Sequence, residues 1–154
     1  GLAWLDLLRD NWESAYATFA EHIDALRESG DRWTTAETLN GMGLALHHQG
    51  KAAEARTHLR ETVTLIRPLA ATPIILEAFA VCARICAKSE PEDAAAWCYL
   101  IINDTRARTL ARQLAKATLE TLDLSASDRT DAENRARTLD LDTCLDQWMN
   151  ATRH

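Results

Sequence analysis

The residues best suited to metal binding or catalysis in this chain are histidines, and His47 and His48 stand side by side. Adjacent residues point about 100° apart on an α-helix, so these two imidazoles cannot share a metal ion well. A zinc pair on a helix needs histidines four residues apart, as in His-Glu-x-x-His, and this motif is absent. His58 follows the turn that we expect after His48 and could approach the pair. We interpret all three as surface and groove histidines and predict no metal site.

Four cysteines are the second group that could bind a metal or react. Cys82 and Cys86 are four residues apart, so they lie on one face of a helix and could supply half of a zinc site. Cys98 and Cys144 lack the paired Cys-x-x-Cys spacing of common zinc sites. In a reducing cytoplasm, we expect all four to be small apolar core residues. A metal- or redox-sensing helical domain that uses Cys82, Cys86 and nearby histidines is the alternative.

Neither the glycines nor the carboxylates form a catalytic pattern. The run Gly41-Met42-Gly43 lacks the further glycine and the Lys-Ser/Thr pair of a nucleotide-binding loop, so we assign it to close helix packing. Several glutamates fall in the first turns of expected helices, where the helix dipole stabilises a carboxylate: Glu13, Glu37, Glu54 and Glu92. Three aspartates near the C-terminus are assigned to a solvated face: Asp140, Asp142 and Asp146. We therefore expect no enzyme activity, no catalytic residue and no cofactor.

The composition favours one compact all-helical domain. The chain has 154 residues with 5 glycines and 3 prolines, and its Lys+Arg 17 and Asp+Glu 23 give a net charge of −6. Few helix breakers among many alanines and leucines favour helices, and the acidic balance offers no basic surface for nucleic acid. The longest uncharged stretch, residues 94–103, is about half of the ~20 residues that cross a bilayer. Because no signal-peptide pattern is present, we expect a soluble, cytoplasmic protein that binds neither nucleic acid nor membrane.

The start of the chain predicts that it is a piece of a longer protein. Its first residue is Gly1 rather than methionine, and the apolar pattern is already running at Leu2. A natural start would offer a cap or a disordered leading segment.

An internal repeat is the strongest signal in the sequence. Residues 36–63 resemble one tetratricopeptide repeat (TPR), with its signature positions filled by Leu39, Met42, Gly43, Leu46, Ala55 and Leu59. Gly43 and Ala55 are small, so two antiparallel helices can approach closely, and residues 49–51 form the turn between them. The signature alanine recurs at Ala15, Ala55 and Ala94, with spacings of 40 and 39 residues.

The repeat predicts an α-solenoid of three TPR-like helical hairpins plus a C-terminal capping helix. The hairpins cover about residues 2–29, 34–67 and 73–120 of a repeat region 1–122, and residues 123–154 belong to the cap. The predicted helices run over about 2–9, 11–29, 34–49, 51–67, 73–88, 90–120 and 128–149, with a possible kink in the sixth at residues 103–106. Two capping boxes are expected, Thr34 with Glu37 and Ser89 with Glu92. The last helix would cover the apolar end of the solenoid.

The wider pattern is similar to the TPR-like C-terminal region of bacterial transcription regulators of the LuxR and antibiotic-regulatory-protein types. The resemblance rests on residues 5–12, the linker 29–33, residues 89–95, and Arg135-Ala136 followed by Trp148. The chain departs from that pattern where Asp10 and Ser89 replace the turn glycine. The resemblance implies a sensor or interaction platform that binds an inducer or a partner protein and restrains an NTPase core located upstream.

A groove lined by the first helix of each hairpin is the predicted binding surface. Its predicted contact residues are Trp4, Glu37, Asn40, Leu44, His47, His48, Glu77, Val81 and Arg84. This mixed apolar and polar surface would suit an amphipathic helix or an extended peptide. Alternatively, these residues pack against missing upstream domains of the same chain or against the C-terminal helix. A free-standing adaptor that scaffolds cytoplasmic proteins is the other reading of the fold, and exposed solenoid ends could form homo-oligomers.

Overall fold

The computed structural model describes residues 3, 6–7 and 9–151, and every regular element in that part of the chain is a helix. The α-helices are α2 (Trp12–Ser29), α3 (Arg32–His48), α4 (Ala52–Ile66), α5 (Thr72–Cys86), α6 (Pro91–Asn103), α7 (Thr109–Thr121), α8 (Ala126–Ala136) and α9 (Leu141–Ala151). One 3₁₀-helix, η1 (Arg67–Leu69), follows α4. The expected all-α class is confirmed, while the arrangement of three hairpins as one solenoid stays a prediction.

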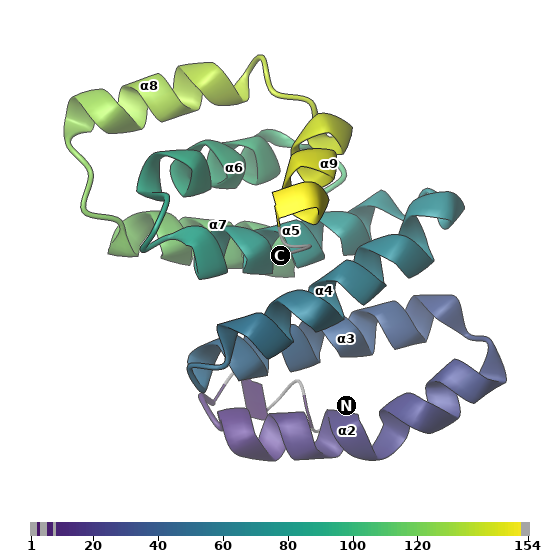
Figure 1. Ribbon diagram of the computed structural model, residues 1–154. Helices are drawn as coiled ribbons and strands as arrows, with labels where there is room; N and C mark the ends of the chain where they lie inside the picture. The colour runs from purple at the N-terminus through teal and green to yellow at the C-terminus, as the bar shows by residue number, and fades with distance from the viewer. Residues whose placement is uncertain (1–2, 4–5, 8, 152–154) are drawn as a thin grey trace. The chain divides into compact units, whose positions relative to one another are not determined.

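The chain divides into two compact units, with the division between Ala78 and Phe79, inside α5. In the first unit, α3 packs against both α2 and α4 (Figure 1). The apolar stripe predicted on α3 is buried, namely Leu39, Met42 and Leu46. Of the stripe predicted on α4, Ala52 is half-buried and the others are buried, namely Ala55, Leu59, Val63 and Ile66. From α2, the residues Ala15, Phe19 and Ile23 complete this core.

The expected close approach of α3 and α4 at Gly43 is confirmed. A Cβ atom at Gly43 would lie 3.0 Å from Cδ2 of Leu59 and 3.6 Å from the carbonyl oxygen of Ala55. A larger side chain would therefore push the two helices apart. Gly41, two residues earlier on α3, makes the corresponding close approach to the Phe19 ring of α2.

The backbone repeats itself at three turns. The residues that precede α2, α4 and α6 are Asn11, Lys51 and Glu90, with ψ angles of 67°, 59° and 65° and no side-chain capping bond. Their spacings of 40 and 39 residues equal the predicted repeat period. Gly50, just before Lys51, has a φ angle of 77°. The equivalent residue just before Asn11 is Asp10, whose φ angle is 60°. Asp10 therefore adopts the left-handed backbone that glycine would adopt there, which aspartate tolerates better than most residues.

In the second unit, α6 packs against α7 and α8 (Figure 1). The Phe79 ring of α5 lies 4.9 Å from the Trp97 ring of α6, centroid to centroid. Three small residues of α6 are fully buried as well, namely Ala94, Ala95 and Cys98. The buried residues of α8 and α9 are Ala132, Ala136, Cys144, Leu145 and Trp148.

Two predicted helices are each divided in the structure. The expected helix 90–120 ends at Asn103, because Asp104 is extended with ψ 121° and its carboxylate accepts hydrogen bonds from the backbone N–H and the guanidinium of Arg106. The single helix expected over 128–149 is wrong, because α8 ends at Ala136 and α9 starts at Leu141. Asp140, expected on a solvated face, accepts a hydrogen bond from the Thr143 backbone N–H and so caps α9.

Both expected capping boxes are wrong. The helix α3 starts two residues earlier than Thr34, because the Asp31 carboxylate accepts the Thr34 N–H at 3.0 Å. The Ser89 hydroxyl instead donates to the Cys86 carbonyl oxygen, and α6 starts at Pro91 without a side-chain cap. A true capping box lies at the start of α8, between Ser125 and Asp128.

Candidate functional site

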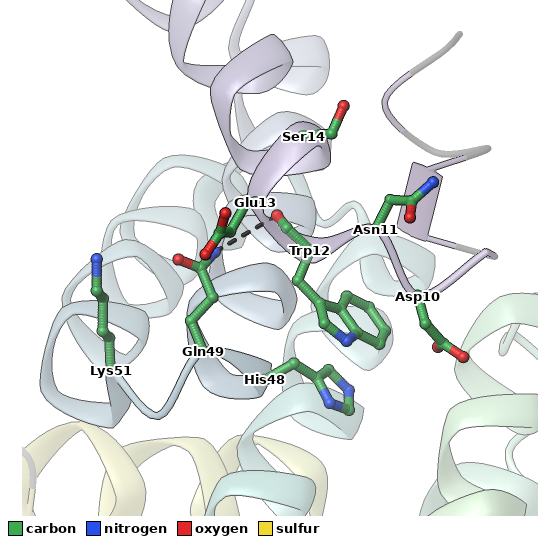
Figure 2. Close-up of a pocket in the computed structure, with 8 residues that line it drawn as sticks. All are labelled: Asp10, Asn11, Trp12, Glu13, Ser14, His48, Gln49 and Lys51. Atoms are coloured by element: carbon green, nitrogen blue, oxygen red, sulfur yellow. Dashed lines mark hydrogen bonds between the residues drawn. The ribbon is translucent and has the colours of Figure 1, made fainter.

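A hollow in the first unit lies where the start of α2 meets the turn between α3 and α4. It encloses about 670 Å³ and is lined by Asp10, Asn11, Trp12, Glu13, Ser14, His48, Gln49 and Lys51 (Figure 2). The left-handed Asp10 reverses the chain just before α2, and Gly50 does the same between α3 and α4. Both walls of the hollow are therefore built by the repeated turn.

A stacked aromatic pair forms the centre of the hollow. The rings of Trp12 and His48 lie 3.8 Å apart and are nearly parallel, at 7°. His47 packs edge-on against His48, with ring centroids 5.2 Å apart. The Gln49 side-chain amide donates to the Trp12 carbonyl oxygen at 3.4 Å, which ties the turn to the first residue of α2. Figure 2 shows this bond and the indole lying over the imidazole.

The rim of the hollow carries charges of both signs. Asp10 and Glu13 contribute carboxylates, and Lys51 contributes an ammonium group. The Ser14 hydroxyl donates to the carboxylate of Asp6 at 2.9 Å, so a third acidic side chain lies beside the lining. Polar groups that can donate and accept hydrogen bonds thus surround the stacked Trp12 and His48 rings.

The predicted groove residues are distributed unevenly. His48 is exposed and lines the hollow, His47 contacts His48, and Glu37 is half-buried. Four others are buried, with exposed fractions of 2% for Asn40, 4% for Leu44, 4% for Glu77 and 2% for Val81. Trp4 lies outside the described residues. The structure therefore brings the two histidines of the predicted set together at one exposed place.

Two of the predicted contact residues bind within their own units. The Asn40 amide donates to the Ile74 carbonyl oxygen at 3.2 Å, which ties α3 to the start of α5. The Arg84 guanidinium donates to the Thr118 hydroxyl at 3.1 Å and to the Leu114 carbonyl oxygen at 3.2 Å, which ties α5 to α7. Burial lowers the pKa of Arg84 from its usual value.

Of the residues that line the hollow, the groove prediction named His48 and missed the others, among them Trp12 and Gln49. The repeat itself held the signal, because Trp12, Ala52 and Pro91 are equivalent first residues of α2, α4 and α6. The first repeat has a tryptophan at this position, where the other two repeats have the smaller residues alanine and proline. This difference in size indicates that Trp12 does more than start its helix. Gln49 was assigned only to the turn.

The four cysteines are buried, as expected for core residues. Burial raises the pKa of Cys98 to about 12, against the opposing effect of Arg84, and burial also raises the pKa of Cys144. Both thiols are thereby held in the protonated form, which is a poor nucleophile and metal ligand. Among the residues that the structure describes, no group of three His, Cys, Asp or Glu side chains is placed to hold a metal ion.

Within the described ranges, none of the helices has the length and apolar character needed to cross a membrane. No family model, curated protein or solved structure matches this chain.

Proposed function

We propose that this chain is a non-catalytic recognition module of TPR-like helical repeats, and that the Trp12–His48 hollow binds a segment of a partner protein. The observation that carries the proposal is the hollow itself, where the half-buried Trp12 ring stacks on the exposed His48 among amide, hydroxyl and charged groups. Tryptophan is enriched among the residues that anchor protein interfaces.

The repeat supports the same function. Three helices that each follow a residue of nearly equal ψ, and a glycine that lets α3 and α4 approach, are features of helical-repeat proteins, which build binding surfaces from such repeats. The module acts in the cytoplasm as the sensor region of a bacterial transcription regulator. That context rests on the sequence resemblance described above.

A selection from a displayed peptide library against the whole chain tests the proposal. We expect peptides to bind with micromolar affinity, and Trp12→Ala to weaken the selected peptides by at least about tenfold because the anchor ring is lost. Affinities are measured by fluorescence polarisation.

Trp33→Ala is the matched control. Trp33 is 44% exposed at the start of α3 and does not line the hollow, so the same loss of a ring should leave affinity unchanged. Peptides that bind wild type and Trp12→Ala equally, or a library that yields no binder, would contradict the proposed function.

A further inference from the structure

An ion pair ties α2 to α4 in the first unit. The Arg27 guanidinium donates to both carboxylate oxygens of Glu61, at 2.9 and 2.7 Å, and also to Asp24 at 3.3 Å. Two parallel N–H···O bonds make this the strongest geometry for such a pair. The side chains are 39% and 33% exposed, so the pair lies at the edge of the packed helices.

His58 stands one helical turn before Glu61 on α4, with its ring half-buried. Its Nδ1 atom is buried and has no hydrogen-bond partner. In the neutral imidazole one ring nitrogen carries no proton, so the buried atom needs no acceptor. Protonation would place an N–H at this buried atom, which is costly unless an acceptor moves to it.

The charges around His58 oppose one another. Glu61 and Glu54 of its own helix favour the imidazolium, and Arg27 of α2 disfavours it. Helix α3 also packs against α4 and carries Glu37 and His47 as half-buried titratable side chains. Once His58 is protonated, Glu61 therefore interacts with two cations, the imidazolium and the Arg27 guanidinium. Glu61 already accepts two hydrogen bonds from Arg27.

We propose that His58 makes the contact between α2 and α4 responsive to mild acid, because its imidazolium draws the Glu61 carboxylate away from Arg27 and loosens the end of α2. The responsive element is the Arg27–Glu61 pair, and the sensor is the imidazole one turn away. The response is independent of what the hollow binds.

The direction of the effect follows from burial. Desolvation of the ring lowers the pKa of His58 below the usual value of 6.5. The unfolded chain therefore takes up this proton at a higher pH than the folded chain. The neutral His58 ring makes its full contribution to the free energy of unfolding above about pH 6.5. This contribution falls as the pH drops below that value, and the loss stops below the pKa of His58 in the folded chain.

Nuclear magnetic resonance of the whole chain between pH 8 and pH 5 tests the inference. We expect the His58 ring resonances to titrate below pH 6.5, the usual pKa of a histidine. The Arg27 Nε resonance should move with the midpoint of His58, and in His58→Gln it should no longer move over this range.

Three outcomes would overturn the proposal. The His58 ring could titrate at or above pH 6.5, the Arg27 resonance could stay fixed while His58 titrates, or the Arg27 resonance could move equally in His58→Gln. His22→Gln serves as the matched control, and its Arg27 resonance should move as in wild type. Because the wild-type titration is decisive alone, the result stands even if His58→Gln does not fold.

Discussion

Gly41 is a position where the lack of a side chain decides how closely two helices pack. A Cβ atom there would lie 2.5 Å from Cζ and 2.6 Å from Cε2 of the buried Phe19 ring. Alanine is normally favoured over glycine in a helix by about 1 kcal/mol. Overpacking a core costs about 1–3 kcal/mol, so we expect Gly41→Ala to lower the free energy of unfolding despite its helix propensity. Urea denaturation followed by circular dichroism measures the change.

The partner of this clash is one ring, so a double-mutant cycle isolates it. In the background of Phe19→Leu, the ring atoms that Gly41→Ala would strike are gone, and the substitution should become neutral or stabilising by up to about 1 kcal/mol. An equal loss in both backgrounds would show that the alanine harms the fold by another route.

The start of α8 shows what a single cap contributes to an element. The Ser125 hydroxyl accepts the Asp128 backbone N–H at 3.0 Å, and the Asp128 carboxylate accepts the Ser125 N–H at 3.3 Å. Ser125→Ala removes the first acceptor, so we expect a loss of about 1 kcal/mol and a melting temperature lower by about 2–4 °C. Differential scanning calorimetry measures both. Ser127→Ala, an exposed change on the same helix, should leave the melting temperature nearly unchanged, and equal effects of the two would refute the cap assignment.

At the level of elements, the sequence predicted the starts of α2, α4 and α6 well because the repeat fixes them. The period of 40 and 39 residues places a residue of nearly equal ψ before each helix, whatever the residue types. The breaks after α6 and α8 were missed or reduced to a kink because single aspartates make them. Asp104 and Asp140 each accept a hydrogen bond from a nearby backbone N–H group. In the sequence, the apolar stripe is interrupted at residues 103–106, which predicted only a kink, whereas the predicted stripe of the last helix continues past Asp140.

The candidate site was predicted in part for a related reason. His48 was assigned to a binding surface because it lies off the packing stripe of its helix. Its stacking partner Trp12 comes from a helix one repeat earlier, and only the folded turns bring the two rings to 3.8 Å. Asn40 and Val81 are buried because other parts of the chain pack over α3 and α5. The sequence of one repeat does not specify which elements pack there.

On the scale of the whole molecule, α5 belongs to both compact units, with Thr72–Ala78 in the first and Phe79–Cys86 in the second. It is buried along almost its whole length, and Ile74, Leu76 and Phe79 are fully buried. Unfolding of either unit would expose apolar residues of a helix that the other unit also needs. We therefore expect the two units to unfold in one cooperative transition.

Fluorine resonances of a chain labelled with 5-fluorotryptophan can follow both units at once. Trp33 reports on the first unit and Trp97 on the second, where it packs on Phe79 of α5. Each resonance is assigned from its own Trp→Phe variant, and the native signals are then followed through a urea titration of the labelled wild-type chain. We expect the two native signals to disappear with the same midpoint, because the shared helix couples the two cores. Separate midpoints would show instead that α5 can break near Ala78 at little cost, and that each half of this chain holds its own core.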